Sequence, residues 1–331
     1  MPRAFGGGLW ERGGVEVRNF NSAIVVGSSG FIGTHLCNAL VEKGIKEISK
    51  IDIKATPSID IRKPFDIDGD FSENTVIFNL AAIHRTPGHP DKEYFETNML
   101  GAENVCCFAV KHNIRTMVFT SSISPYGASE EQKTEETLPT PNSPYGISKL
   151  VAEHIHREWA ASSSEHFLSI ARPGIVFGKG ENGNMTRLYK ALKKRRFAYA
   201  GRKDTIKASI YVKDLVRILI DMAENPKERM QIYNCTYFPA PTIQKIAETM
   251  NKVTGLNRSI PYIPQTPLMV AASVAGAFGG FGLGICSERV RKLMVSTNVS
   301  GEKLNRDYPL RFSLDEAFAD WFKDCEGRWL D

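Results

Sequence analysis

A glycine-rich turn between a strand-like and a helix-like segment constrains the fold of this chain most. The string GSSGFIG begins at Gly27, where the apolar segment 22–27 ends, and it leads into the helical pattern 32–43. Glycines let such a turn close tightly and let backbone N–H groups approach a pyrophosphate, while the helix N-terminus adds roughly half a positive charge. The string therefore predicts a dinucleotide-binding strand–turn–helix unit.

Alternating strand and helix patterns continue through the first half of the chain. Short apolar segments rich in Val and Ile, bounded by turn residues, predict strands at 22–27, 48–52, 76–80, 117–121 and 167–173. Helical patterns at 32–43, 92–112 and 145–160 separate them. Continuously apolar strands in such an alternation predict an α/β fold, a Rossmann-type doubly wound parallel sheet covered by helices on both faces.

The second half is less regular, and it predicts a smaller, interleaved C-terminal substrate domain. A loop rich in Gly and Asn follows Gly178, then come a basic helix, a strand-like SIYV, and helices from Asp214, over 243–253 and over 314–322. We expect a flexible extension at 1–20 and a dinucleotide-binding domain at 21–178, to which 206–236 returns. Residues 179–205 and 237–331 would form the substrate-binding domain.

Composition excludes several classes of protein. With 42% hydrophobic and 24% charged residues, the 331-residue chain is an ordinary folded protein, not a disordered or fibrous one. A net charge of +5 is too weak to predict nucleic-acid binding, and the basic string 193–196 reads as a solvated helix face. The six cysteines lack metal-site spacing and residues 1–20 lack a signal-peptide core, so we expect no metal, reduced thiols and a cytoplasmic location.

One segment complicates this picture. Residues 259–287 contain no charged side chain, and 268–285 are almost wholly apolar, close to the length of a membrane-spanning helix. Five glycines at 276, 279, 280, 282 and 284 make it a poor spanning helix. We expect a buried wall of the substrate domain, with peripheral membrane contact through 268–285 next and a true span last.

An acidic residue indicates which dinucleotide the turn would bind. Asp52 ends the second predicted strand, 19 residues after Gly33. A carboxylate there can accept hydrogen bonds from both ribose hydroxyls of NAD and would repel the 2′-phosphate of NADP. Lys54 lies nearby, so NADP is disfavoured without being excluded.

A tyrosine and a lysine in the sequence YGISK predict the chemistry. Tyr145 and Lys149 are four residues apart, so they share one face of the predicted helix. The lysine ammonium and the positive nicotinamide would favour the phenolate of a tyrosine that normally titrates near pH 10, and so make it a general base. Ser122 follows a strand at the sheet edge where α/β proteins bind ligands, and it could hydrogen-bond the substrate oxygen.

With these motifs the sequence resembles the extended short-chain dehydrogenases/reductases, and specifically the NAD-dependent epimerase/dehydratase group that acts on nucleotide sugars. The resemblance runs from about Ser22 to Trp321 and rests on GSSGFIG, Asp52, NLAA at 79–82, Asn98, SSISPYG, YGISK and RPGIVFG at 172–178. It implies that Ser122, Tyr145 and Lys149 are catalytic. The cofactor residues that it implies are Gly27, Gly30, Phe31, Ile32, Gly33, Asp52, Asp60, Ile61, Leu80, Ala81, Ala82, Asn98, Tyr145, Lys149 and Pro173. Asp66-Ile67 is an alternative to the adenine-contacting pair Asp60-Ile61.

Substrate contacts are implied in both halves of the chain. The implied residues are His84, Ser122, Ser124, Asn184, Arg187, Lys207 and Arg289. Lys207 stands where many relatives place an arginine against the nucleotide diphosphate, so it keeps the charge but loses the bidentate geometry. For His84 a structural, hydrogen-bonded role is favoured over proton transfer. For Asn184, Arg187, Lys207 and Arg289 the alternative reading is a solvated polar side chain.

The residues after Ser122 limit the reaction. Sugar 4,6-dehydratases of this group carry an Asp–Glu pair there, whereas this chain has Ile123 and Ser124, so dehydration is not expected. The leading interpretation is an NAD-dependent 4-epimerase of a UDP-sugar, working through a 4-keto intermediate in surface-polysaccharide or cell-wall synthesis. A nucleotide-sugar dehydrogenase or 4-ketoreductase, a membrane-associated 3β-hydroxysteroid-type dehydrogenase and a non-enzymatic NAD sensor are the alternatives. From the resemblance we expect a homodimer through the helices 92–112 and 145–160.

Overall fold

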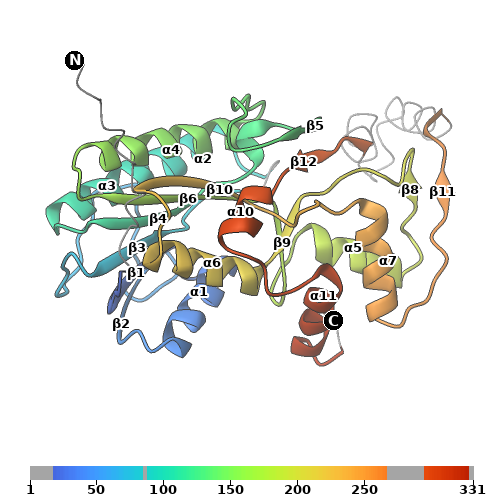
Figure 1. Ribbon diagram of the computed structural model, residues 1–331, viewed down its shortest axis with the longest axis horizontal. Helices are drawn as coiled ribbons and strands as arrows, with labels where there is room; N and C mark the ends of the chain where they lie inside the picture. Colours follow the sequence, from blue (N-terminus) through green and yellow to red (C-terminus); the bar gives the residue numbers. More distant parts are fainter. Residues whose placement is uncertain (1–17, 85–87, 267–293, 328–331) are drawn as a thin grey trace, which may run out of the picture.

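A parallel β-sheet of six strands forms the centre of the computed structural model, which describes residues 18–84, 88–266 and 294–327 (Figure 1). The strand order is β10-β6-β4-β3-β1-β2, and every neighbouring pair is parallel. The strands are β1 (Ser22–Val26), β2 (Glu47–Ile51), β3 (Thr75–Asn79), β4 (Thr116–Thr120), β6 (Phe167–Pro173) and β10 (Met230–Cys235). The predicted α/β fold with a parallel sheet is confirmed.

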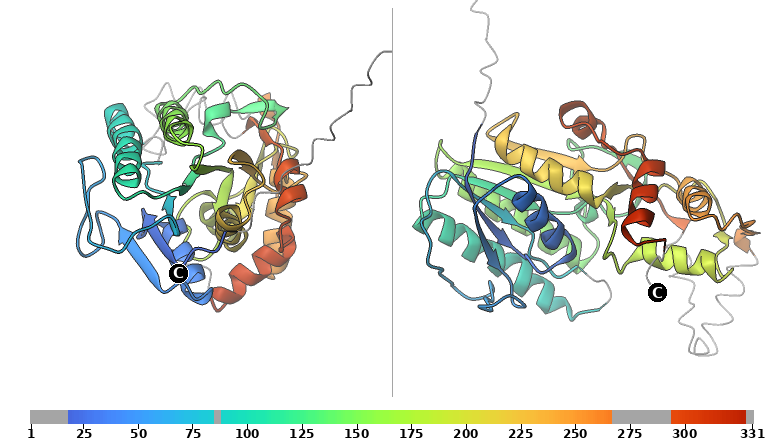
Figure 2. Two further views of the ribbon diagram at one scale, coloured as in Figure 1. Left: turned by 60° about the vertical axis from the view of Figure 1, so that its left-hand side comes forward. Right: turned by 90° about the horizontal axis from the view of Figure 1, so that it is seen from below.

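Helices cover both faces of the sheet. On one face α1 (Phe31–Glu42) packs against α6 (Val212–Glu224), and on the other α3 (Gly101–Lys111) packs against α4 (Pro144–Ala161). Figures 1 and 2 show the sheet between these two pairs. All five residues of β1, β3 and β4 are buried, as expected for apolar strands covered twice, whereas the edge strand β2 is largely open.

The chain reverses its direction of winding between β1 and β3. From β1 it moves outward to β2, and then it returns to place β3 on the other side of β1. In open α/β sheets the crevice at such a switch point, at the carboxyl ends of the strands, is where ligands bind. Residues 52–74, which connect β2 to β3, form neither a helix nor a strand, so this loop is free to wrap the crevice.

The helix predicted over 92–112 is present as a continuous run over 91–111, but it contains a π-helical turn that was not predicted. The structure has α2 (Asp91–Phe95), a π-helical turn η1 (Glu96–Leu100) and then α3. Asn98 lies in η1 with its side chain buried and hydrogen-bonded to the backbone of Ile83. A π-turn inserts an extra residue, which changes the direction of the side chains that follow, and such turns are frequent at functional sites.

The second half is built from short strand pairs and helices. The strands β5 (Ser129–Lys133) and β12 (Thr297–Val299), β7 (Ile175–Phe177) and β9 (Ser209–Tyr211), and β8 (Tyr199–Ala200) and β11 (Tyr262–Ile263) form three two-stranded sheets. The helices are α5 (Asn184–Lys193), α7 (Ile243–Val253), α10 (Glu302–Asp307) and α11 (Leu314–Asp324), with a 3-10 turn, η2 (Ser124–Tyr126), before β5. The strand β5 was not predicted, because its sequence SEEQK is polar and mostly exposed.

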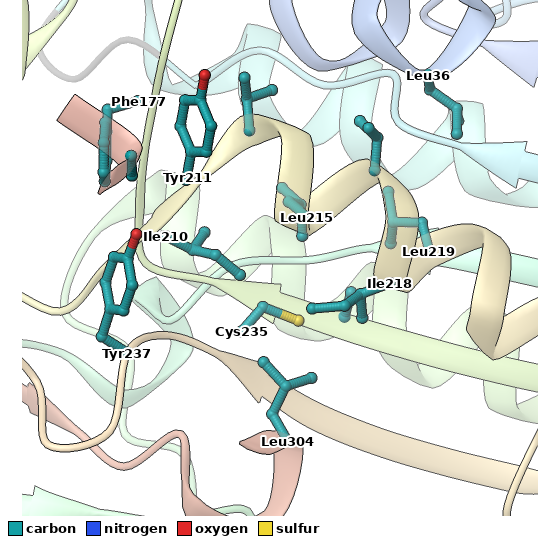
Figure 3. Close-up of a cluster of buried hydrophobic side chains, with 14 of the residues drawn as sticks. Leu36, Phe177, Ile210, Tyr211, Leu215, Ile218, Leu219, Cys235, Tyr237 and Leu304 are labelled. Carbon is teal, nitrogen blue, oxygen red and sulfur yellow. The ribbon is translucent and has the colours of Figure 1, made fainter. Parts of the chain in front are cut away.

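One hydrophobic core joins the two halves. Leu215, Ile218 and Leu219 on the buried face of α6 lie in the same cluster as Phe177 and Leu304 (Figure 3). The ring of Phe177 stacks on that of Phe318 of α11 at 4.8 Å between centroids. The second half therefore packs directly on the sheet and its helices and shares their core.

Candidate active site

A cavity of about 1430 Å³ opens along the carboxyl edge of the sheet. Its lining includes the residues that follow β1, β2, β3, β4 and β6, together with the first turn of α5 from the second half. Pockets for a single small ligand usually measure about 300–1,000 Å³. A cavity of this size is large enough for a dinucleotide and a second ligand side by side.

The glycine-rich turn forms one wall of the cavity. Gly27 has a φ of +86°, and a Cβ there would lie 2.8 Å from the backbone nitrogen of Ala81. A Cβ at Gly33 would lie 2.2 Å from the carbonyl oxygen of Gly27. Both positions need glycine because the backbone passes too close for any side chain. The helix α1 begins at Phe31 without a side-chain cap and without an acidic residue in its first turn, so its N–H groups remain available to an anion.

Asp52 holds this turn from the neighbouring strand. One carboxylate oxygen accepts a hydrogen bond from the backbone N–H of Ser29 at 3.0 Å, and the other accepts one from the N–H of Lys54 at 2.9 Å. Each oxygen keeps a second lone pair, so the carboxylate could also accept the hydroxyls of a ribose in the cavity. The position predicted from the spacing after Gly33 is therefore at the cavity wall.

The structure separates the two candidate Asp-Ile pairs. Asp60 and Ile61 line the cavity, with Asp60 bound to Arg62 by a carboxylate–guanidinium pair of 2.7 Å. Asp66 instead bonds outward to Lys111 and to His112, and these hydrogen bonds lower its pKa to about 2. The geometry thus favours Asp60-Ile61 for the adenine end.

Ser122, Tyr145 and Lys149 meet in the lining of the cavity. Ser122 follows β4, and Tyr145 and Lys149 lie on the first turns of α4, whose N-terminus is capped by the hydroxyl of Ser143 accepting from the N–H of Gly146. The hydroxyls of Ser122 and Tyr145 are hydrogen-bonded, which lowers the pKa of Tyr145, but burial raises it more. Tyr145 therefore needs a nearby positive charge before it can act as a base at neutral pH.

Lys149 can supply this positive charge, and its protonation state changes near neutral pH. Its side chain is 1% exposed, its Nζ donates to the carbonyl oxygen of Thr120 at 2.8 Å, and it lies 4.2 Å from the centre of the Phe119 ring. Burial lowers the pKa of Lys149 to about 7, against the attraction of Glu153. A lysine that is only partly protonated near pH 7 can exchange a proton with its surroundings.

Asn98 lies behind the cavity wall. Its carbonyl oxygen accepts from the N–H of Ile83 at 3.0 Å, and its amide donates to the hydroxyl of Ser148 at 2.8 Å. Ser148 in turn donates to the carbonyl oxygen of Tyr145 at 2.9 Å. Asn98 thus joins the loop after β3 to the first turn of α4, which makes it a positioning residue in this geometry.

The predicted substrate residues divide into those that reach the cavity and those that do not. His84, Ser122, Asn184 and Arg187 line it. Ser124 is not among the lining residues and accepts a hydrogen bond from the hydroxyl of Ser122 at 3.1 Å. Lys207 is not among them either, since its Nζ donates to the carbonyl oxygen of Val295 at 2.8 Å. Arg289 lies outside the described residues, as do 1–17 and the apolar segment 268–285.

A buried ion pair beneath the candidate catalytic residues was not predicted. Glu153 lies two helical turns after Tyr145 on α4 and is 0% exposed, and Arg172 of β6 is 2% exposed. The guanidinium donates twice to the carboxylate, at 2.5 and 2.8 Å, and Ser121 donates to it at 2.6 Å. Arg172 also donates to the hydroxyl of Tyr126, which donates to Asn234 of β10. The network joins α4 to the strands β6 and β10 and to Ser121, which follows β4.

His156, one turn further along α4, continues this buried polar face. It is 0% exposed, stacks on Phe119 at 4.0 Å between ring centres, and bonds through Nδ1 to the carbonyl of Ala152 and through Nε2 to the amide of Asn79. Nδ1–H donates to this carbonyl and Nε2 accepts from this amide, which is the hydrogen-bonding pattern of a neutral ring. Burial, aided by the charge of Lys149, lowers the pKa of His156 to about 4.

We expect this histidine to make the protein sensitive to acid. Between pH 6.5 and 4, His156 is protonated in the unfolded chain but not in the folded chain. The free energy of unfolding therefore falls as the pH falls through this range. At about 1.4 kcal/mol per pH unit the loss is about 3 kcal/mol. Chemical unfolding at pH 6.5, 5.5 and 4.5 should show this loss, and His156→Gln should remove that part of the slope. His154→Gln, at an exposed position on the same helix, is the control and should leave the slope unchanged.

Comparison with known proteins now identifies the family. The model of the NAD dependent epimerase/dehydratase family matches residues 23–236. The chain belongs to this family. It is an enzyme of the extended short-chain dehydrogenase/reductase type, and its cofactor is NAD.

Individual relatives and solved structures agree with this. The N-acetyl-alpha-D-glucosaminyl-diphospho-ditrans,octacis-undecaprenol 4-epimerase of Escherichia coli O157:H7 is 27% identical over 313 residues, or 90% of this chain and 94% of the relative. The UDP-glucose 4-epimerase of Bacillus subtilis (strain 168) is 24% identical over 72% of this chain and 83% of the relative. The structure of UDP-N-acetylglucosamine 4-epimerase from Bacillus cereus superimposes with a TM-score of 0.68 at 18% identity, covering 92% of this chain and 99% of that one.

The residues present in this family member fit NAD. The glycine cradle is open where a Cβ would fill it, and the α1 N-terminus faces it. Asp52 lines the cavity beside this turn, where it could accept the hydroxyls of a ribose, and Tyr145 and Lys149 line the same cavity. Among the described residues, no three His, Cys, Asp or Glu side chains are grouped so as to hold a metal ion, and no helix is long and apolar enough to cross a membrane.

Proposed function

We propose that this protein is an NAD-dependent sugar 4-epimerase that acts on a UDP-sugar through a 4-keto intermediate. The observation that carries the proposal is the meeting of Ser122, Tyr145 and Lys149 with the glycine-rich turn in one cavity. The cavity exceeds what one dinucleotide needs, and Arg187 of α5 adds a positive charge to its lining that could bind a diphosphate.

Each catalytic side chain has a defined task in this proposal. Tyr145 takes the proton from the C4 hydroxyl and later returns it, and Ser122 holds the same oxygen through its hydroxyl. The ammonium of Lys149 stabilises the phenolate of Tyr145. When bound, NAD supplies the site that accepts a hydride from C4 and gives it back. Inversion requires the keto sugar to turn over between the two transfers, and the large cavity leaves room for that movement.

A specific observation favours a second candidate substrate, in which the sugar is carried on a lipid diphosphate and not on UDP. A relative that matches 90% of this chain is named for a sugar carried on diphospho-undecaprenol. The charge-free sequence 259–287 is also what a protein that touches a membrane would carry. The second candidate is therefore 4-epimerisation of a sugar diphosphate carried on a polyprenyl lipid, with the same residues at C4 and peripheral membrane contact through 268–285.

Two further features belong to the proposal. Residues 21–178 and 206–236 would hold NAD, and 179–205 and 237–331 would hold the substrate, in a cytoplasmic enzyme of surface-polysaccharide synthesis.

The homodimer would form through α3 and α4, whose outer faces carry a hollow of about 470 Å³. Val110 of α3 lines this hollow and is 61% exposed although it is apolar. Sedimentation velocity reports the mass directly.

One experiment tests the activity. The purified protein is divided, and one part is denatured and assayed for released NAD. The other is incubated without added cofactor with UDP-glucose, with UDP-N-acetylglucosamine and with N-acetylglucosaminyl-diphospho-undecaprenol in detergent, and the C4 epimers are measured by NMR. An epimerase arrives with bound NAD and turns over without more. Turnover that needs stoichiometric NAD or NADH would instead establish a dehydrogenase or ketoreductase. Oxidation of a sterol, with no activity on the sugars, would establish the hydroxysteroid alternative.

A further inference from the structure

One end of the second half carries a dense group of unpaired positive charges. Residues 184–207 contain nine lysines and arginines and one acid, Asp204. That acid is paired with Arg202. Four other cations, at the end of α5 and just after it, are exposed and have no side-chain hydrogen bond or ion pair to any residue that the structure describes. These four, which we call the α5 basic cluster, are Lys190, Lys194, Arg195 and Arg196.

The backbone holds this cluster outward. On α5 the apolar residues Leu188 and Leu192 face the core, so Lys190 points away from it. The guanidinium of Arg258 donates to the carbonyl oxygens of Leu192 and Lys193 and so closes the helix end. Arg195 then adopts a φ of +55°, a backbone conformation that Gly or Asn adopts at a lower energetic cost. This turn leaves Arg195 exposed just after the helix, between Lys194 and Arg196.

Exposed apolar and aromatic groups lie at the same end of the molecule. The strand β11 pairs with β8, which follows the cluster in the chain, and Tyr262 and Ile263 of β11 are 47% and 39% exposed. The ammonium of Lys203 lies 5.8 Å from the ring of Tyr262. Figure 1 shows α5, α7, β8 and β11 gathered at the end of the molecule opposite β2 and α3. Tyrosine beside lysine and arginine, with a small apolar tip, is the composition of a surface that rests on a lipid bilayer.

The helix α5 connects this surface to the cavity. Asn184 and Arg187, in its first turns, line the cavity, whereas Lys194 follows its last residue. A ten-residue helix is about 15 Å long. A sugar diphosphate on a polyprenyl chain keeps its phosphates at the depth of the lipid headgroups. The enzyme must therefore bring its cavity within about the length of this helix from the bilayer surface.

We propose that the α5 basic cluster, with Tyr262 and Ile263, docks the protein on an anionic lipid bilayer. The proposal rests on the proposed function in its second form, because it gives a membrane-held sugar diphosphate access to the cavity along α5. Anionic headgroups attract polybasic surfaces of this kind, and the attraction weakens with salt. The aromatic and apolar side chains of β11 add contact that salt does not weaken.

Vesicle binding tests the proposal. The full-length protein is sedimented with vesicles of phosphatidylglycerol and phosphatidylcholine, and with phosphatidylcholine vesicles alone. We expect binding to the anionic vesicles at low salt. The variant K190Q/K194Q/R195Q/R196Q should bind at least 10-fold more weakly, and Y262S/I263S should lose the part that survives high salt. The control K46Q/K50Q/K92Q/K323Q, which removes four exposed lysines elsewhere, should bind like the wild type.

The outcomes separate this proposal from the proposed activity. The proposed docking surface is overturned if the wild-type protein does not bind anionic vesicles. It is also overturned if vesicle binding weakens equally in the cluster variant and in the control variant. Binding to an RNA oligonucleotide in place of vesicles also overturns it. The epimerisation of a soluble UDP-sugar is measured for every variant and should not change. If no variant or wild type epimerises any sugar, the proposed function fails while the vesicle result still stands.

Discussion

Tyr145→Phe is expected to lower the rate of epimerisation about 10³-fold or more while leaving the cofactor bound. General acid–base catalysis by one side chain contributes about 10²–10⁴ in rate. Here the removed hydroxyl is the one hydrogen-bonded to Ser122, whereas the glycine-rich turn and Asp52 are untouched. Turnover of the sugar by NMR and NAD released on denaturation measure the two effects separately.

The neighbouring Ile147 offers the control for this variant. It lies on the same turn of α4 and is 39% exposed, so Ile147→Ala removes side-chain atoms without touching the cavity lining. We expect near wild-type turnover from it. A Tyr145→Phe protein that keeps a tenth or more of the wild-type rate would show that another group is the base.

The inner strands of the sheet were predictable because each of them meets one physical demand, whereas the edge strand β10 was not predicted. A strand covered on both faces must be apolar throughout, and the segments at 22–27, 76–80 and 117–121 satisfied that condition in the sequence alone. The position of Asp52 followed from the same geometry, because the carboxyl ends of parallel strands meet at one edge. The pairing of β5 with β12 could not be predicted, since SEEQK is polar and its partner lies more than 160 residues away.

The π-turn at Asn98 and the ion pair under Lys149 escaped prediction for different reasons. No local pattern marks η1, whose Asn98 side chain bonds to the backbone of Ile83 in the loop after β3. The ion pair did leave a signal. Glu153 continues the face of Tyr145 and Lys149 at the next helical turn, and Arg172 interrupts an otherwise apolar strand. A charge in a buried strand must have a buried partner, so these two residues could have been paired in advance.

Glu153→Gln is expected to destabilise the folded protein by about 3–5 kcal/mol, because it leaves the charge of Arg172 buried without its counter-charge. Burial opposes the charge of Arg172, and the hydrogen bonds and charge of Glu153 reverse that effect and raise the pKa of the guanidinium. Without the carboxylate the full desolvation penalty remains. Gln keeps one oxygen that can accept from Ser121, but its NH2 group would face Nη2 of Arg172, so that hydrogen bond of the guanidinium is lost as well. Chemical unfolding at pH 7 measures the loss.

The double variant E153M/R172M decides whether charge imbalance is the cause. It removes both charges and fills the space with side chains of similar volume, a replacement that is often close to neutral for a buried pair. We therefore expect it to recover most of the stability that Glu153→Gln loses, although Ser121 and Tyr126 each lose a hydrogen-bond partner worth about 1 kcal/mol. If the double variant loses as much stability as the single variants Glu153→Met and Arg172→Met together, then each residue stabilises the fold through separate packing. In that case the charges of Glu153 and Arg172 do not stabilise each other measurably.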